Sequence, residues 1–282
     1  SMHKLTSREY NALNSFFGMV VVDEVHIIPA ETFCGVTNQL EAKYKFGLSA
    51  TPKRTDGLTP VIFFTMGPKV HVIPVEELKG VLTPIEYKHI DTEYTFPMID
   101  TSEYTKMITD LSQDQKRNEF IAQKIIQYQV RDGTTVFENT AALWHDDVPK
   151  SVEAESKKSG VVLCTRKEQM YLLKKLIPDS QVLTSDTPKK KREQMIRDFT
   201  DGKFSTIISS YQLFATGIDV PRLEIVAFAA PMRSEIITRQ AAGRLMRIWD
   251  KPKKPIILDF VDNVPLLKGQ AKSRRRTIAS IK

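Results

Sequence analysis

The 282-residue sequence predicts an α/β fold built on parallel β-sheet, and three observations support this class. Residues 17–23 form a continuous apolar run that ends in a carboxylate, which is typical of a strand buried on both faces of a parallel sheet. Between residues 160 and 260, expected strands and helices alternate five times, as they do in doubly wound α/β domains. Hydrophobic residues make up 41% and charged residues 27% of the chain, a composition that favours a folded globular protein over a disordered one.

The first part of the chain is expected to contain two or three strands and one helix. A helix over residues 30–43 is indicated by side chains that recur along one stripe. Residues 76–100 are expected to be extended, because Pro84 and Pro97 disfavour a helix. The expected strands are residues 17–23, 45–51 and 70–75.

The second part of the chain is expected to alternate between strands and helices. Asp114 lies near the start of one helical pattern, and Pro188 begins another at a position where its missing N–H is tolerated. Residues 131–158 show no clear period and predict a loop or an insertion. The expected strands are residues 160–165, 181–184, 206–210, 224–229 and 255–260, and the expected helices are residues 112–130, 167–176, 188–200 and 234–248.

The net charge and the cysteines bear on the kind of binding partner and on the cellular compartment. Lys and Arg outnumber Asp and Glu by 41 to 34, which agrees with a polyanionic partner and equally with a merely basic soluble protein. No apolar stretch approaches the roughly 18 residues of a membrane span, so we expect no membrane partner. Cys34 and Cys164 form no Cys-x-x-Cys pattern, which argues against structural zinc and favours a reducing, intracellular compartment.

The motif Asp23-Glu24-Val-His26 follows the first expected strand. Carboxylates at the carboxyl end of a parallel strand lie by the crevice where such sheets bind ligands. Asp23 is placed to bind Mg²⁺ together with phosphate oxygens, and Glu24 to orient or deprotonate an attacking water. The same residues also fit a solvated, acidic strand end.

The motif Gln240-x-x-Gly243-Arg244-x-x-Arg247 lies on an expected helix. Its spacing predicts a single stripe, because residues three, four and seven apart share one helix face. Two arginines one turn apart suit the oxygens of a transferring phosphoryl group, and Gly243 lets a phosphate or another backbone come close. A surface helix with two solvated arginines is the alternative.

Four shorter motifs end other expected strands or follow them. Ser49-Ala50-Thr51 could hydrogen-bond to the acidic motif, and Thr216-Gly217-Ile-Asp219 could hold the arginine helix or touch a ribose. Thr165-Arg166 and Thr184-Ser185 suit nucleic-acid phosphates through hydroxyls and helix N-termini. Each also fits an ordinary turn or helix cap.

Taken in order, these motifs resemble those of the DExH-box superfamily 2 helicases, and within them the branch of XPB, UvsW and the transcription helicases of large DNA viruses. The strings at residues 22–30, 47–57 and 114–118 carry that similarity as well, so it covers nearly the whole chain. The resemblance implies two RecA-like motor domains that close on ATP and open on hydrolysis. The second would be complete here, and the first would be represented by its C-terminal part.

The residues and the resemblance together assign three kinds of role. The resemblance implies that the acidic motif serves Mg²⁺ and water, and that the arginines face the γ-phosphate of ATP. The catalytic residues are then Asp23, Glu24, His26, Gln240, Arg244 and Arg247; the residues that couple nucleotide state to movement are Ser49, Ala50, Thr51, Gly217 and Asp219; and the nucleic-acid-binding residues are Thr165, Arg166, Thr184, Ser185 and Thr216.

The phosphate-binding loop of this family, Gly-x-x-x-x-Gly-Lys-[Ser/Thr], does not occur in the 282 residues. Without its lysine and its backbone N–H groups, the β- and γ-phosphates lack their main cradle. We therefore expect a fragment of a longer ATP-dependent helicase or translocase, acting on DNA or else on RNA, with little ATPase activity alone. A natural motor remnant that binds nucleic acid or a protein partner without hydrolysis is the alternative.

The expected domain organisation follows from the motifs and the resemblance. Residues 1–80 would be the C-terminal part of the first RecA-like domain, and residues 81–113 a connector. Residues 114–265 would be the second RecA-like domain with an insertion at 131–158, and residues 266–282 a basic tail.

Overall fold

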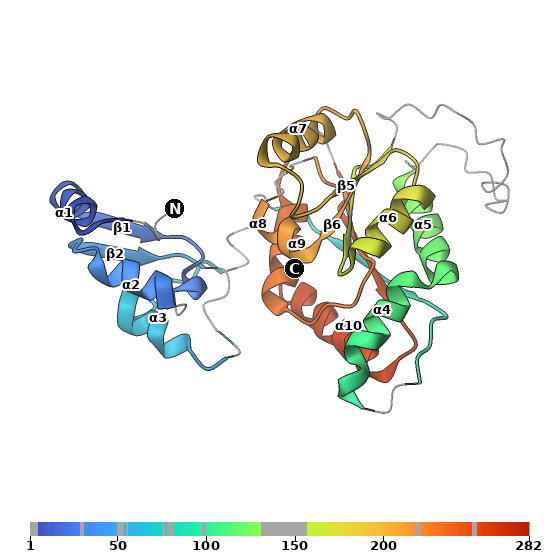
Figure 1. Cartoon of the computed structure of the whole chain (residues 1–282), viewed down its shortest axis with the longest axis horizontal. Helices are drawn as coiled ribbons and strands as arrows, with labels where there is room; N and C mark the ends of the chain where they lie inside the picture. Colours follow the sequence, from blue (N-terminus) through green and yellow to red (C-terminus); the bar gives the residue numbers. More distant parts are fainter. Residues whose placement is uncertain are drawn as a thin grey trace. The chain divides into compact units, whose positions relative to one another are not determined.

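Parallel β-sheet forms the framework of both parts of the chain, which confirms the predicted α/β class. The computed structural model describes residues 5–281 apart from 29–30, 50–53, 55, 75–76, 78–81, 98–99, 131–156, 218–219, 221 and 250–252. The chain divides into two units, Ser1–Pro74 and Val75–Lys282 (Figure 1). Most of the expected insertion at residues 131–158 lies outside the described residues.

Within its described residues, the first unit, Ser1–Pro74, contains a pair of parallel strands and three α-helices. Its first helix begins at a capping box, in which Thr6 and Glu9 satisfy each other's backbone N–H groups. The elements are α1 (Ser7–Phe16), β1 (Met19–Val22), the 3₁₀ turn η2 (Val25–Ile27), α2 (Glu31–Gln39), β2 (Tyr44–Gly47) and α3 (Thr59–Met66).

One face of this two-stranded sheet is apolar and exposed. The parallel register pairs Met19 with Tyr44 and Val21 with Phe46, and these four side chains are between 45% and 56% exposed. The alternate apolar residues of β1 pack against small clusters with the helices. The prediction that this strand is buried on both faces was therefore wrong for the residues that the structure describes.

The second unit, Val75–Lys282, is built on a six-stranded parallel sheet in the order β3-β8-β7-β4-β6-β5 (Figure 1). The sequential strands β7 and β8 lie on one side of β4, and β5 and β6 lie on the other. The strands are β3 (Glu86–Asp91), β4 (Gly160–Cys164), β5 (Ser180–Leu183), β6 (Thr206–Ser210), β7 (Ile225–Phe228) and β8 (Ile256–Val261). The helices are η4 (Thr101–Glu103), α4 (Tyr104–Gln113), α5 (Gln115–Gln129), α6 (Lys167–Leu176), α7 (Lys189–Thr200), α8 (Tyr211–Gly217), α9 (Glu235–Met246) and α10 (Pro265–Ala279).

Both faces of this sheet are covered by helices, and β4 shows why its sequence is apolar throughout. Val161 and Leu163 belong to the core cluster on the side of α7 to α10, whereas Val162 and Cys164 belong to the cluster with α5 and α6. Every residue of β4 is buried. A strand at the centre of a two-sided core therefore has no polar side, as expected for a parallel sheet.

Several predicted boundaries were wrong. Residues 81–113 are more than a connector, because they contribute the edge strand β3 and the helix α4 to the second unit. Residues 266–282 are not a tail but lie almost wholly within α10, which packs against α9. The expected helix over residues 112–130 is two helices that meet at Asp114, the N-cap of α5. The expected strand at 70–75 is absent from its described residues, 70–74.

Candidate functional site

The acidic motif forms a tight turn after β1. Asp23 is exposed, and its Oδ1 accepts a hydrogen bond of 2.8 Å from the backbone N–H of Glu24. Glu24 has a φ of 51° and a ψ of 50°, the left-handed conformation that non-glycine residues rarely adopt. Such a strained conformation persists only where surrounding contacts hold the residue in place, and it is found preferentially at functional sites.

His26 connects the acidic motif to the end of the second strand. It is 8% exposed, and its Nδ1 lies 3.2 Å from Oγ of Ser49 and 3.2 Å from Oε2 of Glu24. The guanidinium of Arg54 donates to the backbone carbonyl of His26. The structure thus brings Glu24, His26 and Ser49 together, with the histidine in contact with both the carboxylate and the serine. Ala50 and Thr51 lie outside the described residues.

Asp23 fits the role of a magnesium ligand that also needs phosphate oxygens. Its carboxylate is exposed at a strand end, and one oxygen is already oriented by a backbone N–H. Within the described residues no group of three His, Cys, Asp or Glu side chains could hold a metal ion by itself. Mg²⁺ is commonly bound by one or two carboxylates together with the phosphates of its substrate, and this arrangement suits such binding.

In the second unit, the carboxyl ends of three adjacent strands surround a hollow of about 460 Å³. Polar side chains from the ends of β4, β5 and β6 line it, and Met170 and Leu213 contribute apolar surface. The polar residues are Thr165, Lys167, Thr184, Ser185, Ser210 and Gln212. The hollow lies where ligands of open parallel sheets bind, and it brings together three of the five predicted nucleic-acid-binding residues.

The other two predicted nucleic-acid-binding residues are placed less directly. Arg166 is the N-cap of α6 and makes no capping hydrogen bond through its side chain. Its Nε is buried without a hydrogen-bond partner among the described residues, so an added acceptor would relieve it. Thr216 lies in the last turn of α8, and its side chain is not described.

The arginine motif lies at the end of α9, which begins at Ser234, the N-cap that accepts from the N–H of Ile237. Gln240, Gly243 and Arg244 belong to this helix. Arg247 lies just beyond it in an extended conformation, as the C-cap, and is exposed. The φ of Arg247, −55°, is still helical, so its Cβ continues the predicted stripe and only the chain after it leaves the helix.

Arg244 ties α9 to α8. Its Nη2 donates to the backbone carbonyl of Ala215 at 2.7 Å, and its guanidinium lies 5.7 Å from the centre of the Phe214 ring. Ala215 directly precedes the Thr216-Gly217 motif, whose Gly217 ends α8, while Asp219 lies outside the described residues. That contact is made by Ala215, one residue before the motif, so the expectation that residues 216–219 hold the arginine helix stays a prediction.

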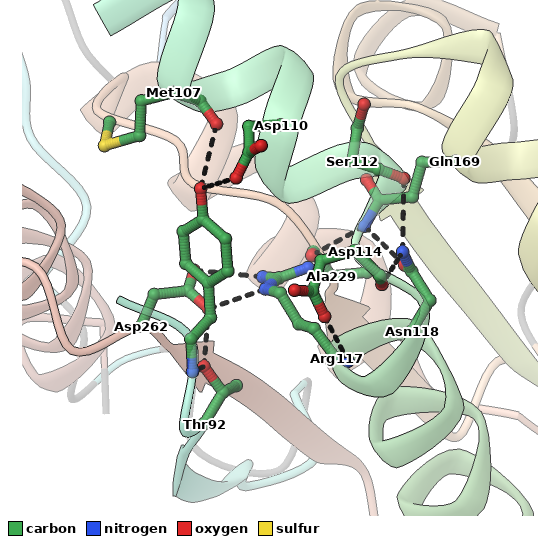
Figure 2. Close-up of polar contacts among 11 residues, drawn as sticks. Thr92, Met107, Asp110, Ser112, Asp114, Arg117, Asn118, Gln169, Ala229 and Asp262 are labelled. Carbon is green, nitrogen blue, oxygen red and sulfur yellow. Dashed lines mark hydrogen bonds and ion pairs between the residues drawn. The ribbon is translucent and has the colours of Figure 1, made fainter. Parts of the chain in front are cut away.

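A buried polar network lies at the same carboxyl edge of the sheet (Figure 2). Arg117, in the first turn of α5, donates to Asp262 through Nε at 2.6 Å and through Nη2 at 3.0 Å. Gln169 of α6 donates to Oδ1 of Asn118 at 3.0 Å and to the carbonyl of Ala229 at 3.2 Å. Because the first residue of α6 lines the hollow, this network fixes the helix on which the hollow depends.

Sequence reasoning missed three polar residues of the hollow: Lys167, Ser210 and Gln212. Each was detectable by the rule that identified their neighbours, because Lys167 directly follows Thr165-Arg166 and the other two end or follow β6. Arg54 was also missed, and its contact with the His26 carbonyl joins residues 28 positions apart.

Known protein families match both parts of the chain that carry these motifs. Residues 145–248 match the family described as helicase conserved C-terminal domain, and residues 1–54 match the family described as type III restriction enzyme, res subunit. The fold resembles the solved structure of S. cerevisiae Dbp5 bound to RNA and ADP BeF3, with a TM-score of 0.57 and 13% identity, over 94% of this chain and 58% of that one.

Two relatives show the same relationship over most of the sequence. The Acanthamoeba polyphaga mimivirus protein L396, named as an ATP-dependent RNA helicase, is 27% identical over 268 residues, which are 92% of this chain and 46% of that protein. The DNA 3′-5′ translocase XPB2 of Sulfurisphaera tokodaii is 27% identical over 275 residues, 88% of this chain and 60% of that protein. The chain thus spans about half the length of these relatives.

The fold and the motifs define a protein of the RecA-like motor class. The family matches and the relatives define the similarity more closely: the chain is similar to superfamily 2 helicases, and among them to the branch of XPB, UvsW and related viral helicases. The predicted resemblance is therefore confirmed. Among the described residues, no helix combines the length and the apolar character that a bilayer crossing requires.

Proposed function

We propose that this chain is the strand-binding part of an ATP-dependent helicase or translocase that moves along nucleic acid, and along DNA in preference to RNA. The observation that carries the proposal is the hollow at the ends of β4, β5 and β6. It presents hydroxyl, amide and ammonium groups, which are the groups that bind phosphate and sugar oxygens in a sequence-independent manner. A motor that steps along any sequence needs contacts of this kind.

In the longer protein, the two remaining motifs would serve the nucleotide. ATP, bound together with Mg²⁺, would supply the free energy for movement through its hydrolysis. Asp23 would hold the metal, and Glu24 would orient the attacking water while His26 fixes the position of its carboxylate. Arg244 and Arg247 would stabilise charge on the transferring phosphoryl group, with Arg244 oriented by the Ala215 carbonyl.

We also propose that the 282 residues alone do not hydrolyse ATP at an appreciable rate, because they contain no Gly-Lys-Ser or Gly-Lys-Thr loop. Nucleic-acid binding should survive, since the hollow lies wholly within the second unit. The two activities are therefore expected to separate: the chain binds strands without turning over ATP. ATP hydrolysis by the purified chain that is stimulated by nucleic acid would contradict this part of the proposal.

Binding is tested by fluorescence anisotropy with labelled dT and rU oligonucleotides at several salt concentrations. Ser185→Ala and Thr165→Val should each weaken binding by up to about tenfold, because a hydrogen bond to a charged group contributes about 1.5 kcal/mol. Thr109→Val on the exposed face of α4 is the matched control and should leave affinity unchanged. Equal effects of all three substitutions would show that the hollow does not bind the strand.

The choice between DNA and RNA is tested on the longer protein, by unwinding of DNA and RNA duplexes. The names of the relatives point to both, and the similarity to the XPB and UvsW branch favours DNA. A motor remnant that only binds is the second candidate, favoured by the lack of the phosphate-binding loop in these residues. A longer gene product that carries the loop and hydrolyses ATP would exclude it.

A further inference from the structure

An ion pair closes part of the rim of the hollow at the ends of β4, β5 and β6. Lys167, the first residue of α6, lines the hollow, and its Nζ is paired with the carboxylate of Asp186. Asp186 lies in the segment between β5 and α7, and its other oxygen accepts a 3.2 Å hydrogen bond from the hydroxyl of Ser185. One carboxylate thus engages two of the groups that would bind a phosphate.

The charge of Asp186 differs from that of its surroundings. Residues 184–192 contain one acidic residue and four basic ones, Lys189, Lys190, Lys191 and Arg192. The three lysines are exposed, and Arg192 donates to the backbone carbonyls of the same segment. A segment that otherwise attracts polyanions therefore places its only negative charge against the cation of the hollow.

The exposure of this pair makes it exchangeable. The side chain of Lys167 is 50% exposed and that of Asp186 is 68% exposed, so water screens their attraction. An exposed pair of this kind contributes little to stability, and a phosphate oxygen can replace the carboxylate without leaving a buried charge unpaired. The segment between β5 and α7 needs no refolding for the exchange, because only two side chains must turn.

We propose that Asp186 competes with the nucleic-acid backbone for Lys167 and Ser185, and so sets the affinity of the hollow for a phosphodiester. The proposal rests on the proposed function and names the groups that bind one phosphate. When no nucleic-acid strand is bound, the Asp186 carboxylate pairs with the Lys167 ammonium and accepts a hydrogen bond from the Ser185 hydroxyl. When the strand is bound, a phosphate takes that position and Asp186 turns to solvent. A motor that must release its strand at every step gains a lower affinity in this way.

The test uses the whole 282-residue chain, labelled dT and rU oligonucleotides, and a salt series. Asp186→Asn should bind about three- to tenfold more tightly than the wild type at low salt, because a phosphate then reaches Lys167 and Ser185 without displacing a carboxylate, and the gain should shrink as salt screens these charges. The gain should be equal on dT and rU, since both present the same phosphate. Lys167→Ala should weaken binding, and adding Asp186→Asn to it should restore almost nothing.

Asp198→Asn is the matched control, because it also removes one carboxylate that is paired with a lysine on the surface, Lys203. An equal gain in Asp186→Asn and Asp198→Asn would overturn the proposal, since it would reflect net charge alone. A gain on only one of the two oligonucleotides, or no gain, would also overturn it. If the wild type and Asp186→Asn bind neither oligonucleotide, the proposed function fails with it; if the wild type binds and Asp186→Asn matches it, only this inference fails.

Discussion

Asp262 accepts three hydrogen bonds while almost completely buried, and its removal should destabilise the second unit strongly. Arg117 donates to it at 2.6 and 3.0 Å, and the hydroxyl of Thr92 donates at 2.6 Å. Both side chains of the ion pair are 1% exposed. Asp262→Ala would leave the guanidinium buried with no carboxylate beside it, which costs about 3–5 kcal/mol because a buried charge must then be left without its partner.

That loss can be measured cleanly because both tryptophans of the chain, Trp144 and Trp249, belong to the second unit. Urea unfolding followed by tryptophan fluorescence therefore reports on this unit alone. With a slope of about 2 kcal/mol per molar urea, the unfolding midpoint of Asp262→Ala should fall by about 2 M. Lys203→Ala is the control. The side chain of Lys203, which pairs with Asp198, is 61% exposed, so its removal should shift the midpoint by less than about 0.5 M.

A double substitution distinguishes the cost of an unpaired charge from the value of the pair. Arg117→Met combined with Asp262→Leu removes both charges, so it should be markedly less destabilising than the sum of the single substitutions. Additive losses, or an Asp262→Ala midpoint close to that of the Lys203→Ala control, would refute the argument. Either result would mean that water reaches this carboxylate in spite of its burial.

Two further predictions concern other parts of the chain. A Cβ added at Gly47 would lie 2.6 Å from Cγ2 of the buried Val25. Gly47→Ala should therefore destabilise the first unit by about 1–3 kcal/mol and speed hydrogen exchange over η2. Gly35→Ala is the control and should do neither, because its added Cβ would meet nothing within 4 Å. Burial lowers the pKa of Lys253 from 10.5 to about 8, so Lys253→Met should stabilise the second unit by about 1–2 kcal/mol at neutral pH, after allowance for partial exposure. Because the unfolded state binds more protons than the folded state between these two pKa values, the advantage of the methionine should shrink as the pH rises from 8 to 10.5 in urea titrations, and a constant difference would contradict it.

Elements with a strong local signal were predictable from sequence. The helix expected over residues 167–176 is α6, Lys167–Leu176, and the strand expected at 206–210 is β6, Thr206–Ser210. In α6 the residues that pack inward recur with the helical period, whereas β6 is a short run in which Thr206 to Ser209 are all buried, so neighbouring residues suffice to identify either element. The strand ends were predictable for the same reason, and with them Thr165, Thr184 and Ser185.

The place of the extended segment β3 in the sheet and the last helix α10 were not predicted, because distant residues define them. β3 pairs with β8, and Tyr87 of β3 donates to Asp259 at 2.6 Å across 172 positions of sequence. α10 carries an Arg-rich run that resembles a solvated tail, yet Arg274 within it is 2% exposed and donates to the same carboxylate. Composition alone cannot show that one of three consecutive arginines is buried, since the partner lies in another element.

The same limit applied to the acidic motif, whose role depends on one residue of unusual conformation. Glu24 adopts the left-handed conformation at a cost of about 1 kcal/mol, and this reverses the chain so that η2 returns over the ends of β1 and β2. Asp23 offsets part of the cost by accepting the Glu24 N–H, and the N–H of Val25 donates to the carbonyl of Leu48 at 2.9 Å. The reversal places His26 against Ser49, 23 positions away. The parallel register, in which Val22 pairs with Gly47, already places the ends of β1 and β2 side by side, and the turn at Glu24 then sets the His26 side chain against Ser49.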